Sequence, residues 1–108
     1  MLYEYRVYEA MPGKLPELQA RFRNHTVKLF EKHGIKNIGY WTSVVGDYSN
    51  RLIYIVAFED SAQRDRAWVS FNDDPEWKRV KAETEANGPL ISRLFNTLLS
   101  PTDYSPLQ

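Results

Sequence analysis

The sequence predicts an α+β domain in which a four-stranded antiparallel sheet carries helices on one face only. Three observations lead to this prediction. Four short segments have the residue character of β-strands, and two longer stretches have that of helices. The order of these six segments is βαββαβ, which brings both helical stretches to the same side of the sheet.

The first strand is expected over Leu2–Glu9, where alternate side chains point to opposite faces. Turn-forming residues at Met11–Gly13 end this strand. The three- and four-residue apolar spacing that follows predicts a helix over Leu15–His33, and Gly34 suits its C-terminal cap.

A β-hairpin is expected next, with strands over Ile38–Val45 and Arg51–Glu59. The residues between them, Gly46–Asn50, are turn formers. A broken second helix is predicted over Ser61–Asn87, because Asp74 and Pro75 have the character of an N-cap and a first helical position.

The last strand is predicted over Ile91–Leu99, after Gly88 and Pro89 stop the second helix. This completes a ferredoxin-like βαββαβ arrangement. The 108 residues are interpreted as one domain, with its core over residues 2–100 and a short C-terminal tail over Pro101–Gln108.

The third strand predicts how the chain assembles. Its segment Leu52–Phe58 is apolar on both sides, whereas the helices cover only one face of the sheet. Two copies packed sheet to sheet would cover the other face and form a dimeric α/β barrel, so a homodimer is expected. A heterodimer or a further partner domain would satisfy the same requirement.

Composition limits the classes of partner. Fourteen Lys and Arg balance fourteen Asp and Glu, so no overall charge favours nucleic acid or an anionic membrane. With no cysteine and only two histidines, neither a metal site nor a bound cofactor is expected. We found no apolar run long enough for a membrane anchor and no signal peptide, and the expected location is cytoplasmic.

The chain resembles the NIPSNAP family over Leu2 to about Pro101. The resemblance rests, in order, on Tyr5-Arg6-Val7-Tyr8, Pro12-Gly13-Lys14, His33-Gly34, Gly39-Tyr40-Trp41, Gly46, Asn50, Arg64 and Asp74-Pro75-Glu76-Trp77. It implies a dimeric α/β barrel of the group that includes cofactor-independent monooxygenases, isomerases and haem-degrading enzymes. The haem-degrading relatives use a histidine in or after the second helix, and this sequence has none after His33.

Candidate catalytic residues lie on one face of the first strand, where Glu4, Arg6 and Tyr8 alternate. Since Glu and Arg are rarely buried under helices, this face is assigned to the lumen between the two sheets. There Arg6 would bind an anion and Glu4 would take a proton. In the alternative interpretation, Glu4 and Arg6 form a purely structural ion pair.

Candidate ligand-binding residues are Arg6 and Tyr8, together with alternate positions of the hairpin strands. These positions are Tyr40, Thr42, Tyr54 and Phe58. They would give an aromatic wall with polar tips, which is typical of a small-molecule site. Ordinary packing between sheets is the alternative. Trp41 faces the other way and is assigned to the core.

The two histidines are interpreted separately. His25 lies on or beside the apolar face of the first helix, where it would be a general base or a buried histidine bonded to a backbone carbonyl. His33 suits a helix C-terminus and a capping role. Arg64 is expected to reach Asp74 or Glu76 and brace the break in the second helix. Trp77 is expected to anchor the following segment to the core.

Two functions are therefore predicted. The first is a barrel that binds a small aromatic or anionic molecule, between sheet and helices or in the dimer lumen, with cofactor-independent oxidation or proton transfer as its chemistry. The second is a protein-interaction module without a cavity. The size of the cavity between the two sheets distinguishes the two functions. Side chains that fill this space completely would leave the first function without a site, whereas a polar, water-holding cavity around Arg6 would support it.

Overall fold

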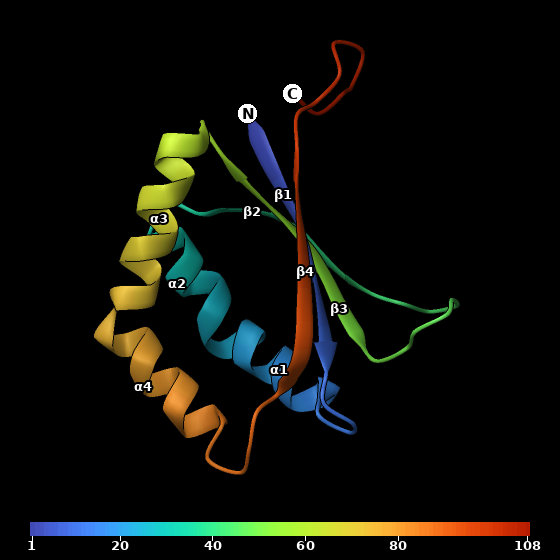
Figure 1. Cartoon of the computed structure of the whole chain (residues 1–108), viewed down its shortest axis with the longest axis vertical. Helices are drawn as coiled ribbons and strands as arrows, with labels where there is room; N and C mark the ends of the chain where they lie inside the picture. The colour runs from blue at the N-terminus through green and yellow to red at the C-terminus, as the bar shows by residue number, and fades with distance from the viewer.

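The computed structural model describes residues 1–108 and has the predicted order of elements. Strands β1 (Leu2–Ala10), β2 (Lys36–Thr42), β3 (Arg51–Phe58) and β4 (Ile91–Leu99) form one sheet. Neighbouring strands are antiparallel, in the order β2-β3-β1-β4. The helical elements are α1 (Leu15–Arg21), the π-helical segment η1 (Phe22–Thr26), α2 (Val27–Lys32), α3 (Ser61–Asp73) and α4 (Pro75–Thr84). They all lie on one side of the sheet (Figure 1). The predicted ferredoxin-like α+β class is confirmed.

The core lies between β1, β3 and the helices. Tyr54 on β3 and Phe30 on α2 are almost completely buried, and Phe22 on η1 packs its ring against both. Tyr8 on β1 meets Phe22 and Tyr54 in edge-on contacts. Such aromatic pairs stabilise a core beyond the area they bury. They fix the position of β1 under the helices.

The first helical run is interrupted by a π turn that the sequence did not predict. Four of its buried residues, Leu18, Phe22, Thr26 and Phe30, are spaced by four. In a uniform α-helix each four-residue step would move the side chain about 40° around the axis. The wider turn of η1 offsets this drift, and Thr26 Oγ1 donates to the Arg21 carbonyl 3.3 Å away. All four side chains therefore face the sheet.

The hairpin differs from the prediction at the end of its first strand. β2 ends at Thr42, which is paired with Leu52, whereas the prediction extended the strand to Val45. Val44 and Val45 are 97% and 94% exposed. Their apolar character does not place them in the sheet, because no residue of β3 lies opposite them.

The break in the second helix is where the sequence placed it. Asp74 is in an extended conformation between α3 and α4, and its side chain accepts a hydrogen bond of 2.8 Å from the amide of Glu76. Pro75 takes the first position of α4, where its missing amide hydrogen costs nothing. The helix ends at Thr84 rather than at Asn87.

No helix covers the second face of the sheet, which we call the open face (Figure 1). Its exposed apolar side chains are Tyr5, Trp41, Phe95 and Leu99. The assignment of Trp41 to the core is wrong, since its side chain is 51% exposed. The indole lies over Gly39, where an added Cβ would come within 2.6 Å of the ring. Only glycine leaves room for this contact.

The C-terminal tail returns to the sheet. The Tyr3 hydroxyl donates a 2.7 Å hydrogen bond to the carbonyl oxygen of Gln108, so both ends of the chain meet at one end of β1. None of the helices has the length and apolar composition that a bilayer crossing requires.

Candidate functional site

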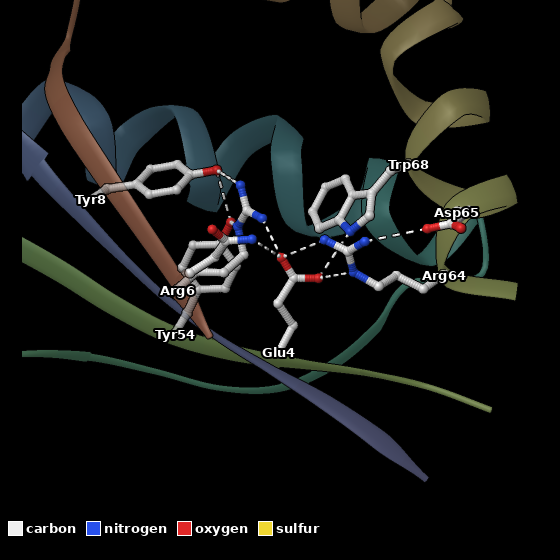
Figure 2. A network of polar contacts seen from close by, with 8 residues as sticks. Glu4, Arg6, Tyr8, Tyr54, Arg64, Asp65 and Trp68 are labelled. Carbon is white, nitrogen blue, oxygen red and sulfur yellow. Dashed lines mark hydrogen bonds and ion pairs between the residues drawn. The ribbon is translucent and has the colours of Figure 1, made fainter. Parts of the chain in front are cut away.

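Glu4 is a fully buried carboxylate at the centre of the helix-covered face (Figure 2). It accepts five hydrogen bonds from four side chains. These come from Arg6 Nη1 at 2.5 Å, Arg64 Nε and Nη2 at 2.7 and 3.3 Å, Trp68 Nε1 at 3.1 Å and Asn96 Nδ2 at 3.2 Å. A carboxylate with this many donors is stabilised in its charged form despite its burial.

The prediction that this face of β1 turns toward a lumen between two sheets is wrong. Glu4 and Tyr8 point toward the helices, as their contacts with α3 and η1 show. The expectation failed because the cost of burying a lone Glu does not apply to a paired one. Arg64 supplies the pairing charge, and it does so instead of bracing Asp74 as expected.

The charge state of Glu4 follows from these contacts. Burial alone would raise its pKa, but the hydrogen bonds of Arg64 and Trp68 and the charge of Arg6 lower it to about 2. The carboxylate is therefore ionised over the whole physiological pH range. It holds the two guanidinium groups in place and is not available as a base near neutral pH.

Acid is expected to weaken the fold through this residue. The unfolded chain binds a proton at Glu4 near pH 4.5 and the folded chain only near pH 2, so stability is present above pH 4.5 and is lost as the pH falls toward 2. The loss amounts to up to about 3 kcal/mol. Urea unfolding of the wild type and Glu4→Gln at several pH values measures it. If the free energy of unfolding fell equally with pH in both proteins between pH 4.5 and 2, the prediction would be contradicted.

Arg6 joins Glu4 to a pair of tyrosines. Its Nε donates to the Tyr54 hydroxyl at 2.8 Å and its Nη2 to the Tyr8 hydroxyl at 3.1 Å. The Tyr54 hydroxyl donates in turn to that of Tyr8, 2.9 Å away. Burial raises the pKa of Tyr54 well above the usual value, so its phenol stays protonated. The guanidinium carbon also lies 4.6 Å from the centre of the Trp68 ring, a cation–π contact.

A cavity of about 770 Å³ lies between the sheet and the helices, beside Arg6 and Tyr8. Its size is within the range of small-molecule sites. Its wall is rich in aromatic side chains, namely Tyr8, Phe22, Phe30, Trp68, Phe71 and Trp77. The partly exposed side chains of Val69 on α3 and Leu94 on β4 also line it and mark its rim. The arrangement suits a flat organic molecule.

A second arginine lines the same cavity. Arg21 on α1 is buried, with Nη1 bonded to Glu85 Oε2 at 2.9 Å and to Thr84 Oγ1 at 3.3 Å. Its Nε has no hydrogen-bond partner, and its guanidinium carbon lies 5.3 Å from the centre of the Trp77 ring. The sequence does contain a signal for Arg21, which lies three positions after the apolar Leu18 and so beside the buried side of the helix.

The structure brings only some of the predicted site residues together. Arg6 and Tyr8 line the cavity, and Tyr54 lies directly behind them. Tyr40 stacks on Tyr54, with ring centres 5.1 Å apart, and does not line the cavity. Phe58 is a core residue packed on Trp68.

Two other candidates lie elsewhere. Thr42 is exposed at the end of β2, and His25 is half-buried on η1 without lining the cavity. Neither residue contacts the Glu4–Arg6 network.

His33 links the helices instead of lining the cavity. Its Nδ1 lies 2.6 Å from Ser70 Oγ and its Nε2 lies 2.6 Å from Asp74 Oδ2. Asp74 also accepts a 2.9 Å bond from Lys32, which with His33 holds the pKa of Asp74 well below its usual range. Because this carboxylate also caps α4, the cluster braces the junction of α2, α3 and α4. No group of three or more His, Asp or Glu side chains is arranged to hold a metal ion.

Comparison with known proteins agrees with this architecture. The sequence matches the NIPSNAP family over residues 3–106, nearly the whole chain. The chain belongs to the NIPSNAP family. The NipSnap homolog 3B of Mus musculus is 34% identical over 76 residues, which are 70% of this chain and 30% of that protein. The chain thus spans less than a third of this curated relative.

Solved NIPSNAP structures share the fold. A NIPSNAP family protein of unknown function from Agrobacterium tumefaciens is 25% identical, with a TM-score of 0.87 over 100% of this chain and 94% of that one. An uncharacterised NIPSNAP domain protein from Burkholderia xenovorans is 22% identical, with a TM-score of 0.84 over 98% and 99%. SnoaB from Streptomyces nogalater, a cofactor-independent oxygenase, is 15% identical, with a TM-score of 0.63 over 97% and 96%. The last two likenesses concern the fold alone.

Proposed function

We propose that this NIPSNAP domain binds a small, flat organic molecule in the cavity between its sheet and its helices. The observation that carries the proposal is the aromatic cavity of about 770 Å³ with Arg6 and Tyr8 in its wall. A buried ion network with Glu4 holds Arg6 in one position before any ligand arrives. Preorganised polar groups in an aromatic cavity are what small-molecule sites require.

The interaction-module alternative concerns the space between the sheets of two copies, which stays a prediction. The cavity between the sheet and the helices of one chain supports the binding hypothesis. As an enzyme, the domain would carry out the cofactor-independent oxidation or isomerisation that the family resemblance implies, and the shared fold of the oxygenase SnoaB is consistent with it. The expected cytoplasmic location stays a prediction.

Ligand binding is expected to be lost when the cavity is filled. Val69→Trp places an indole at the rim from a position that is 63% exposed, so the fold tolerates it. We expect 2-naphthoate and related aromatic acids to stabilise the wild type, by about 2.7 kcal/mol at about 100 times the Kd. Thermal unfolding with and without ligand measures this effect.

The matched control is Val44→Trp, which adds the same indole to the hairpin loop far from the cavity wall. This control is expected to respond to ligand as the wild type does. If the aromatic acids stabilised Val69→Trp as much as the wild type, the cavity would be ruled out as the binding site. If no aromatic acid stabilised the wild type, the proposed function would be refuted.

We also propose that two copies pair through their open faces. The proposal rests on the exposed apolar side chains of Tyr5, Phe95 and Leu99, which no element of the chain covers. A second copy presents the same apolar surface and is the self-complementary partner that two-fold symmetry requires.

Leu99→Glu, on the edge strand β4 of the open face, is expected to convert a dimer into a monomer in sedimentation experiments at low micromolar concentration. Pairing would bury the new carboxylate without a partner, at a cost that a dimer interface does not offset. Val44→Glu adds the same charge in the hairpin loop and is expected to leave the dimer intact. Sedimentation of the wild type as a monomer would refute the pairing.

A further inference from the structure

The Tyr54 hydroxyl can donate its hydrogen to one acceptor only. Tyr54 is fully buried, and its oxygen already accepts a hydrogen bond from Arg6 Nε. The Tyr8 hydroxyl, 2.9 Å away, is the acceptor within reach. Because an unsatisfied buried hydroxyl is costly, Tyr54 must donate to Tyr8 and not the reverse.

The direction of this bond determines what Tyr8 offers. The Tyr8 oxygen accepts from Tyr54 and from Arg6 Nη2, which fills both of its acceptor positions. Its own hydrogen has no acceptor in the protein, while Tyr8 lines the cavity. In Figure 2 dashed lines join the Tyr8 hydroxyl to Arg6 and to Tyr54.

We propose that Tyr8 is the hydrogen-bond donor that recognises the ligand, and that the ligand is an aromatic compound carrying an anionic oxygen such as a carboxylate. This deepens the proposed function and rests on it. A ligand that reaches Tyr8 meets a donor there, since both acceptor positions of the Tyr8 oxygen are occupied. The guanidinium of Arg6 behind Tyr8 favours a negatively charged oxygen over a neutral one.

The aromatic part of the ligand class follows from the rings that line the same cavity. Trp68 and Phe71 from α3 and Phe22 from η1 are among them, and Phe22 contacts Tyr8. Flat rings stack on such side chains with a gain beyond the area buried. A ligand with its oxygen at Tyr8 therefore has its ring system among these residues.

The test compares 2-naphthoate with 2-methylnaphthalene, which has the same rings but no oxygen, in equilibrium dialysis. Tyr8→Phe is expected to weaken binding of 2-naphthoate about tenfold or more, because the loss is one hydrogen bond to a charged acceptor. Binding of 2-methylnaphthalene is expected to stay unchanged. Tyr54→Phe is the matched variant, since it removes one hydroxyl from the same network and leaves the Tyr8 donor in place.

The possible outcomes separate the role of Tyr8 from the proposed function. Equal loss of 2-naphthoate binding in Tyr8→Phe and Tyr54→Phe would show a general effect of the network and would overturn the role of Tyr8. Unchanged binding of 2-naphthoate in Tyr8→Phe would also overturn the role of Tyr8, while the proposed function would still stand. If the wild type binds neither compound, the proposed function fails and this inference fails with it.

Discussion

Glu4→Ala is expected to lower the free energy of unfolding by about 3–5 kcal/mol, because it leaves buried positive charge without its partner. The side chains of Arg6 and Arg64 are only 12% and 22% exposed, and both bond to Glu4. Without the carboxylate they repel each other in a region that water scarcely reaches. Urea unfolding at neutral pH measures the loss.

The control for Glu4→Ala is Glu83→Ala. Glu83 also pairs with an arginine, Arg79, but both side chains are more than half exposed. Exposed ion pairs contribute little, so a much smaller change is expected. The double variant Glu4→Leu with Arg6→Leu is expected to be more stable than Glu4→Leu alone, since it removes one of the two arginines left without a partner. A change in Glu4→Ala no larger than in Glu83→Ala would mean that the network does not hold the fold.

Phe30→Ala is expected to cost about 3–5 kcal/mol as well, for a reason unrelated to charge. Phe30 is 1% exposed and lies at the centre of the aromatic core. Its ring centre is 5.0 Å from that of Phe71 and 5.4 Å from that of Trp68. Removal leaves a void that the surrounding rings cannot fill without leaving their rotamers.

The Phe30 prediction is checked by the midpoint and slope of urea unfolding. The slope is expected to stay at the wild-type value, since the unfolded chain exposes nearly the same surface. Val44→Ala, at a position that is 97% exposed, is the control and is expected to leave the midpoint unchanged. A midpoint for Phe30→Ala equal to that of Val44→Ala would contradict the packing described above.

Sequence reasoning recovered the fold because local signals agree with one another. The βαββαβ order follows from two periodicities, and the helix break follows from the capping chemistry of Asp74 and Pro75. The failures are at positions whose environment is set by distant residues. Val44 has strand-forming character, yet no strand lies opposite it. The exposure of Trp41 depends on which face the helices leave bare.

The candidate site was predicted in part for the same reason. Arg6 and Tyr8 were identified from their alternation on one strand, but their face was assigned from the usual exposure of single charged residues. The partner that reverses this assignment, Arg64, is sixty residues away from Glu4. A signal was present, since Arg64 and Trp68 are four residues apart and thus project donors from one side of a helix.

The π turn of η1 holds one residue more than a uniform α-helix needs between the turns that flank it. Deleting one residue within the solvent-facing pair Arg23–Asn24 can therefore be absorbed by conversion of the turn to α-helix. Eleven α-helical steps of about 100° then bring Leu18 and Phe30 back to nearly the same side, so both stay in the core. The same deletion within α1 or α2 has no such outlet and would rotate the turns on one side of it by about 100°. The segment thus tolerates the loss of a residue at one place only.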